Sequence, residues 1–161
     1  MPQVDFYLLP DETSAARWSF ACKLIEKVLR LNFQVHVIFD TPEQCQAFSL
    51  QLWNFKPESF LPHLYLAPDQ LRPLLCPITL GVHEQLPDWP QLTKPVEKQF
   101  LLLNLSNQPV NASLSELLAY ADRIGEVVVQ ETVCLTATRN RYKAYQQEGI
   151  PIETRKIETV Q

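Results

Sequence analysis

The stretch FLLLNL (residues 100–105) decides the fold class. A continuous apolar run of this length is typical of a strand that is buried on both faces of a parallel sheet. Four further short runs, rich in apolar and β-branched residues, also predict strands: VDFYLL (4–9), QVHVIF (34–39), PITLGV (77–82) and EVVVQE (126–131). We therefore expect a mostly parallel sheet of about five strands.

Amphipathic helix patterns alternate with these strands. Residues 13–32 place apolar side chains at helical spacing and charged side chains on the opposite side. The segment TPEQ (41–44) then opens a second helix, which extends to about Trp53. Three signals coincide there, because Thr41 is a good N-cap, a proline occupies the first helical position, and a glutamine completes a capping box.

The carboxyl-terminal half continues the alternation. SLSELLAYADR (113–123) predicts a helix that begins with a capping box, and residues 132–148 predict a helix that ends at Gly149, a suitable C′ glycine. Strands alternating with helices indicate a single α/β domain over residues 1–149, with a mainly parallel sheet and helices on both faces. Residues 150–161 show no clear period and are interpreted as a C-terminal tail.

Composition narrows the functional classes. The 161-residue chain has a formal net charge of −4. Its pI near 5.4 argues against a protein that coats nucleic acid, because such proteins carry a basic face and a high pI. No apolar run approaches the roughly 20 residues of a membrane helix. The opening MPQVDFYLLPDE lacks the features of a signal peptide, so we expect a cytoplasmic protein with no membrane partner.

The predicted sheet resembles a nucleotide-binding architecture, but the chain is poor in glycine. Phosphate cradles such as GxGxxG need glycine so that backbone can approach the phosphate closely. The three glycines are Gly81, Gly125 and Gly149, and none follows the first predicted strand. Asp40 ends the second strand, where a ribose-binding acid would lie, although a turn or capping aspartate is the simpler interpretation. We expect no cofactor.

Catalytic and metal-binding signals are weak. The nucleophile-elbow pattern GxSxG does not occur, and His36, His63 and His83 are scattered over predicted strands and loops. The four cysteines form no CxxC pair, which favours structural thiols over metal ligands. The sequence therefore predicts no catalytic residue and no metal site.

The last helix concentrates positive charge in an acidic chain. On a helical wheel, Arg139, Tyr142 and Lys143 share one side, so an aromatic ring lies between two cations. An arginine can grip a carboxylate bidentately while the ring buries a neighbouring apolar group. This pattern fits an acidic peptide that ends in an apolar residue. The alternative is a solvated basic face near a helix C-terminus, which also suits the helix dipole.

The opposite side of this helix is expected to face the sheet. Val133, Ala137 and Ala144 cluster there on the wheel. Arg141 and Tyr145 fall nearer the edge of the core, where Arg141 could bury its stem and extend its head to water.

Three segments carry a resemblance to a known family. RNRYKAYQQEG (139–149) resembles the C-terminal helix of the bacterial DNA polymerase III chi subunit family, which shares an R-x-RYKAY segment. VDFYLL (4–9) and LWNFKPESFLPH (52–63) are also similar to that family, whereas residues 64–98 and 150–161 match it poorly. The resemblance implies an accessory subunit without catalytic activity on a nucleotide-fold-like, glycine-poor domain.

The resemblance also implies partners. Chi-family proteins bind the acidic C-terminal tail of single-stranded DNA-binding protein and pair with the psi subunit in the clamp-loader complex. Transferred to matching positions, Arg139, Tyr142 and Lys143 would hold the tail, and Val128 on the neighbouring strand would help to form the pocket. DNA would then be contacted only indirectly.

A second surface is implied around the WNFKPESFLPH segment. There Trp53, Phe60, Leu61 and Pro62 would contact a psi-like subunit or a repair helicase. Adjacent apolar residues in a Pro-flanked loop are hard to bury together, and an exposed apolar patch marks a protein partner. The alternative for Trp53 is core packing at the end of its helix.

Two other functional classes stay open. A nucleotide-dependent enzyme on a Rossmann-like fold would need phosphate donors at the end of the first strand, where the sequence is bulky and acidic. A single-stranded DNA-binding module could use the arginine and tyrosine of the last helix, because aromatics and cations also hold bases.

Overall fold

The computed structural model describes residues 3–31, 33–54, 63–65, 78–82, 99–107 and 121–157. Seven strands and three helices occur in these ranges. In chain order they are β1 (Gln3–Leu8), α1 (Ser14–Arg30), β2 (Phe33–Phe39), α2 (Pro42–Trp53), β3 (His63–Tyr65), β4 (Ile78–Val82), β5 (Gln99–Asn104), β6 (Arg123–Val128), α4 (Thr132–Gln147) and β7 (Ile152–Lys156).

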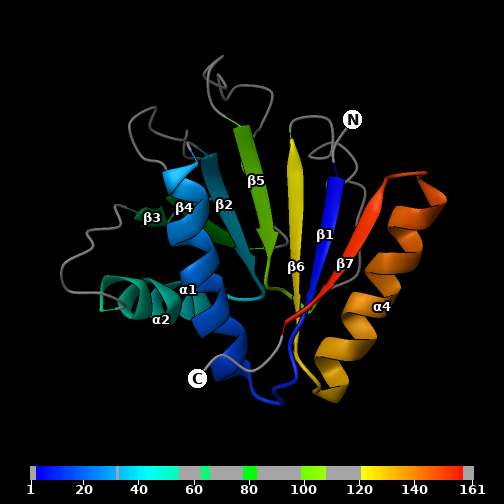
Figure 1. The fold of residues 1–161 in the computed structure, drawn as a ribbon. Coiled ribbons are helices and arrows are strands. Elements are labelled where there is room, and N and C mark those ends of the chain that lie inside the picture. Colours follow the sequence, from blue (N-terminus) through cyan, green and yellow to red (C-terminus); the bar gives the residue numbers. More distant parts are fainter. Residues whose placement is uncertain are drawn as a thin grey trace.

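The strands form one sheet in the order β3-β4-β2-β5-β6-β1-β7 (Figure 1). Each pair of neighbouring strands in that order is parallel. Leu102 at the middle of β5 aligns with His36 of β2 on one side and Ile124 of β6 on the other. The apolar run that opened the sequence analysis is therefore a central strand, and the prediction of an α/β domain with a mainly parallel sheet is confirmed.

Alternate residues of the strands enter two separate cores. On β5, Leu101 and Leu103 join the larger cluster, and Phe100 and Leu102 join the smaller one. The larger cluster, here the α1/α2 core, contains buried side chains of both α1 and α2 and also Cys134 at the start of α4. Tyr145, further along α4, lies in the smaller cluster, here the α4 core. Helices thus cover both faces of the sheet, as Figure 1 shows for α1 and α2 on one side and α4 on the other.

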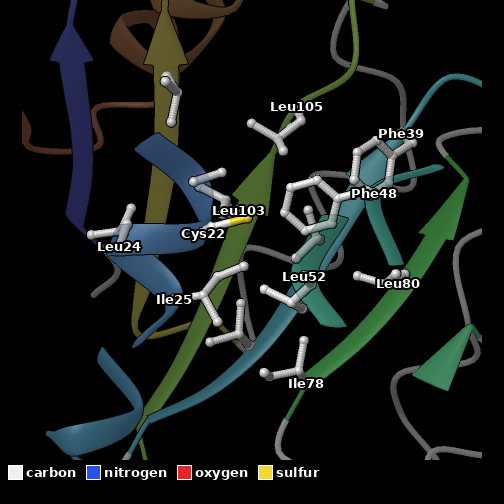
Figure 2. Packing of buried hydrophobic residues seen from close by; sticks show 14 of the residues in the cluster. Cys22, Leu24, Ile25, Phe39, Phe48, Leu52, Ile78, Leu80, Leu103 and Leu105 are labelled. Carbon is white, nitrogen blue, oxygen red and sulfur yellow. The ribbon is translucent and has the colours of Figure 1, made fainter. Parts of the chain in front are cut away.

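Aromatic side chains fill the middle of the α1/α2 core. Phe48 of α2 lies fully buried against Phe39 of β2, with ring centroids 5.1 Å apart, and Trp18 of α1 contacts both rings edge-on at 5.5–5.6 Å. Figure 2 shows Phe39 and Phe48 side by side, with Leu52 and Leu80 nearby. Burial of large apolar side chains such as these stabilises the fold by about 1.5–3 kcal/mol each.

The helix boundaries follow local signals. The Thr41 hydroxyl accepts a hydrogen bond from the Gln44 backbone amide, and the Gln44 side-chain Oε1 accepts one from the Thr41 backbone amide, so the predicted capping box is present. Gly149 follows α4 with φ of 73°, the left-handed conformation that a C′ glycine adopts at little cost. Glu131, which the sequence analysis did not single out, caps the start of α4 by accepting from the amides of Val133 and Cys134.

Three strands differ from the expectations. The strand expected at residues 126–131 occupies Arg123–Val128 and has Gly125 in its interior. A β-carbon at Gly125 would lie 3.0 Å from Leu103 Cδ1, so the missing side chain lets the two strands pack. The sheet also gains β3 and β7, so the prediction of about five strands was too low. The helix expected at 113–123 lies mostly outside the described residues.

Candidate functional site

The cationic residues of α4 lie on its outer side. Arg139 and Lys143 are exposed, and Tyr142 between them is half-buried. Within the described part of the chain, neither cation forms an ion pair. The structure therefore brings the three predicted residues together on one side of the helix, with both positive charges available to an incoming acidic group.

The Tyr142 ring connects this side of the helix to the sheet. Its edge contacts the ring of Phe6 on β1, with centroids 5.2 Å apart and planes at 63°. Leu8 and Leu135 are likewise half-buried against the α4 core. The surface beside the two cations therefore contains apolar side chains with part of their area open to solvent, which is what an apolar peptide residue needs to bind.

Val128 occupies a different depth from the other three predicted residues. It lies at the end of β6 with only 3% of its surface exposed, and it belongs to the same α4 core against which Tyr142 packs. Val128 therefore lies beneath the surface that Tyr142 helps to form and is not part of that surface itself.

A fully buried polar cluster lies under α4. The Glu126 carboxylate on β6 accepts hydrogen bonds from Arg141 Nε at 2.8 Å and Nη2 at 2.7 Å. The Tyr145 hydroxyl donates a third bond, also of 2.7 Å, to Oε2. Arg141 and Glu126 side chains have no exposed area. The expectation that Arg141 extends its head to water was wrong, because a buried acid on the sheet draws the guanidinium inward.

The same cluster explains the orientation of the helix. The buried stripe of α4 comprises Cys134, Ala137, Thr138, Arg141 and Tyr145. Val133, which was expected to face the sheet, is 55% exposed. Ala137 is buried as expected and Ala144 is partly so. The inner side of the helix is therefore the one that carries Arg141 and Tyr145. Their bonds to the buried Glu126 carboxylate stabilise this orientation more than burial of Val133 would stabilise the alternative.

Burial and charge act on the titration of this cluster. Desolvation lowers the pKa of Arg141, but the Glu126 carboxylate and its hydrogen bonds outweigh it, so the net shift is upward. Desolvation, followed by the charge of Glu126, raises the pKa of Tyr145 well above its ordinary value. Arg141 therefore stays charged and Tyr145 stays a neutral donor at physiological pH.

The second predicted surface is described only at Trp53. This residue ends α2 and is 44% exposed, and Leu50 one turn earlier is 64% exposed. Trp53 does not end in the core, so the core-packing alternative is wrong for this residue. Phe60, Leu61 and Pro62 lie outside the described residues.

The carboxyl edge of the sheet is occupied by internal contacts. Both carboxylate oxygens of Asp40 accept from the Asn107 amide at 3.1 Å, so this acid joins two loops. Buried Arg17 of α1 donates to the Val127 carbonyl at 2.9 Å and to Asn107 Oδ1 at 3.0 Å. Burial lowers the pKa of this guanidinium. Asp40 therefore has a structural role between two loops that are distant in sequence, which neither the ribose-binding nor the turn or capping interpretation anticipated.

Metal and thiol chemistry have little support in the described ranges. No group of three or more His, Cys, Asp or Glu side chains that could hold a metal ion occurs in them. Cys22, Cys45 and Cys134 are buried, and burial raises the pKa of Cys22 and of Cys45 to about 12. None of the helices in the described ranges has the length and apolar character needed to cross a membrane.

Two buried charged residues were not predicted from the sequence. Glu126 was seen only as the first residue of an apolar strand, and Arg17 was not singled out at all. The available signal was an acid inside an otherwise apolar run, EVVV, followed by an arginine in the next helix. A buried acid needs a partner, and the parallel sheet brings the following helix directly over it.

Comparisons with known proteins bear on the fold and on the family. The crystal structure of T4 UvsW aligns with a TM-score of 0.66 at 9% identity and covers 98% of this chain, which spans 41% of the UvsW chain; this likeness concerns the fold alone. The DNA polymerase III subunit chi of Pseudomonas aeruginosa is 28% identical over 157 residues, 98% of each protein. The family model for the DNA polymerase III chi subunit, HolC, matches residues 1–153. The chain therefore belongs to the DNA polymerase III chi subunit family.

Proposed function

We propose that this chain is a non-catalytic accessory subunit that binds the acidic C-terminal tail of single-stranded DNA-binding protein and links it to a psi-like subunit of the clamp-loader complex. The observation that carries the proposal is the outer side of α4. There Arg139 and Lys143 are exposed without an acidic partner in the described part of the chain, on either side of the half-buried Tyr142.

The chemistry of each residue fits a chain terminus. The planar guanidinium of Arg139 matches a terminal carboxylate bidentately, as a single ammonium cannot. Tyr142 offers apolar area beside it, supported by Phe6 and the core that contains Val128. Lys143 supplies a point charge for acidic residues further from the terminus, and an exposed pair of this kind is weakened by salt.

The link to a psi-like subunit or a repair helicase is proposed at the end of α2. Half-exposed Trp53 and the exposed Leu50 one turn earlier form the described part of that surface. Phe60, Leu61 and Pro62 complete it in the proposal, on the strength of their sequence context. The tail site and the partner site would then occupy opposite faces of the sheet, since α2 and α4 cover different faces. Separate faces leave both partners room to bind together, and DNA is contacted only through the protein partner.

Titration calorimetry with a synthetic tail peptide tests the proposal. A charge-assisted hydrogen bond is worth roughly 1.5–3 kcal/mol, so Arg139→Ala should weaken binding about tenfold to a hundredfold. Amidation of the peptide's terminal carboxylate should weaken binding to the wild type strongly and add little to the loss in Arg139→Ala.

The matched control is Trp53→Ala, which should bind the tail like wild type but lose affinity for a psi-like partner. A DNA oligomer and ATP form two further arms of the experiment. Wild-type affinity of Arg139→Ala for the tail would contradict the proposal. Micromolar binding of ATP would favour the nucleotide-dependent enzyme. Tight binding of the DNA oligomer in the absence of single-stranded DNA-binding protein would favour a DNA-binding module.

A further inference from the structure

The buried cluster beneath α4 joins two residues of the helix to one carboxylate of the sheet. Arg141 and Tyr145 are one turn apart on the helix, and both end at the Glu126 carboxylate. All three side chains are essentially without exposed area. Buried ion pairs contribute little net stability compared with well-packed apolar groups, but they impose directions that apolar contacts do not. The cluster therefore calls for an explanation in terms of orientation.

Helix geometry connects the buried cluster to the outer side of α4. Successive residues are about 100° apart, so a residue two positions from Arg141 lies about 160° around the helix from it. Arg139 and Lys143 are each two positions from Arg141. When the guanidinium of Arg141 is fixed inward, both cations are forced outward. A rotation of the helix would separate buried charges that have no water to replace their bonds.

An aromatic chain makes a second connection. Phe6 on β1 lies beside Glu126 in the parallel register. The Phe6 ring contacts Tyr145 with centroids 6.2 Å apart and Tyr142 with centroids 5.2 Å apart. The Tyr145 ring, tethered through its hydroxyl to Glu126, thus holds Phe6, and Phe6 holds the ring of Tyr142.

The rest of the inner stripe of α4 gives little rotational control. Apart from Arg141 and Tyr145 it consists of Cys134, Ala137 and Thr138, and the Thr138 hydroxyl bonds to the Cys134 carbonyl within the helix. Small side chains can slide over a sheet surface without large loss of contact. The Cys134 thiol reaches the Val127 carbonyl only at 3.9 Å, whereas the shortest bonds to the Glu126 carboxylate are 2.7–2.8 Å long and select one orientation more strongly.

We infer that Glu126 is a positioning residue for the tail site: through Arg141 and Tyr145 it fixes the rotation of α4, so that Arg139, Tyr142 and Lys143 point toward the tail. The inference rests on the proposed tail binding. Glu126 itself does not touch the peptide; it determines where the three residues that do so are held.

The test is a double-mutant cycle between the buried pair and Arg139. In E126L/R141M both charges are replaced by apolar groups of similar size, an exchange that buried pairs often tolerate without loss of folding. This variant should bind the tail peptide about tenfold more weakly than wild type, and the same exchange in an Arg139→Ala background should change affinity less than about threefold. The Tyr142 ring resonances should also shift, because their distance from the Phe6 ring changes.

The control is the D5N/R123M pair on the opposite face of the sheet, where Arg123 bonds to Asp5 at 3.1 Å. It should leave both tail affinity and the Tyr142 resonances unchanged. If E126L/R141M does not fold, Tyr145→Phe serves in its place, because it removes one hydroxyl donor and keeps the ring. This variant should still bind the tail peptide about two- to fivefold more weakly than wild type and should shift the Tyr142 ring resonances.

The possible outcomes separate the two ideas. If Arg139→Ala binds the tail like wild type, the proposed function fails. If Arg139→Ala binds weakly but the folded buried-pair variant binds like wild type with unmoved Tyr142 resonances, only the positioning role of Glu126 fails. The positioning role would also be overturned if E126L/R141M lowered tail affinity equally with and without Arg139→Ala, because the effect would then not depend on Arg139.

Discussion

The two faces of the sheet are built in different ways. The α1/α2 core is an apolar cluster whose centre is formed by Phe39, Phe48 and neighbouring leucines (Figure 2). The α4 core is smaller and lies beside the fully buried pair of Glu126 and Arg141. The α1/α2 face also has directional contacts, from Arg17 and between Arg123 and Asp5. Among the described residues, however, only the α4 face holds an ion pair in which both side chains are fully buried.

The difference coincides with what each face is proposed to do. A helix that only covers a core can shift slightly without consequence, because dispersion contacts re-form after small displacements. A helix that presents Arg139 to a carboxylate cannot, because bidentate recognition tolerates little misplacement. The comparison predicts that damage to the α4 face affects stability and tail binding together, and that damage to the α1/α2 face affects stability alone.

The largest effect is expected from Arg141→Ala. It leaves the Glu126 carboxylate buried without its main partner, and breaking such a pair costs about 3–5 kcal/mol of unfolding free energy. Tail affinity should fall in the same variant at temperatures where it remains folded. Urea unfolding and peptide titration measure the two losses. Arg123→Ala is the control, since that arginine side chain is 41% exposed. The buried Asp5 carboxylate keeps Gln3 and Arg155 as partners in this variant, so the loss should be smaller than for Arg141→Ala.

Leu52→Ala should lower the stability of the fold through the α1/α2 core and leave tail binding unchanged. Leu52 is 1% exposed in the larger core, and such truncations cost about 2–5 kcal/mol through lost burial and the cavity left behind. Tail-peptide affinity measured well below the melting temperature should equal that of wild type. A loss of tail affinity comparable with that of Arg141→Ala would show that the two faces are not independent.

The smallest effect is expected at the exposed start of α4. Bonds from the amides of Val133 and Cys134 hold the pKa of Glu131 below its ordinary value of 4.5. A lowered folded-state pKa gives stability that is present above pH 4.5 and is lost as the pH falls through the folded-state value. Glu131→Gln should therefore have a lower melting temperature than wild type at pH 7, and the difference in melting temperature should shrink below pH 4.5. The variant should bind the tail peptide like wild type. A constant difference across this pH range would contradict the role of the charge.

Much of the fold could be predicted because its signals are local. The run at residues 100–105, the capping box at Thr41 and the C′ position of Gly149 each depend on a few neighbouring residues, and all three predictions are confirmed. β7 could not be predicted in this way. Its sequence IETRK is mostly exposed and charged, and it is a strand because β1 offers an open edge beside it. An edge strand carries a weak pattern, since only one of its sides is paired.

The candidate site shows the same division. The side of α4 that bears Arg139, Tyr142 and Lys143 was predicted from helical spacing, because the angle between residues of one helix is set by backbone geometry. The wheel placed Val133 toward the sheet, however, because it weighed apolar residues and left the arginine and tyrosine at the margin. Spacing gives the relative angles of side chains but not the absolute rotation of the helix against the sheet.

The sequence by itself therefore determined the alternation of the central strands with helices, the start of α2, the end of α4, and which residues of α4 share a side. Tertiary structure alone decided which side faces inward, because Glu126 meets Arg141 and Tyr145 only when β6 and α4 are packed together. It also decided that Asp40 joins two loops through the Asn107 amide. The physical reason is the same in both cases: a buried charge selects its partner by position in space, and residues distant in sequence acquire that position only on folding.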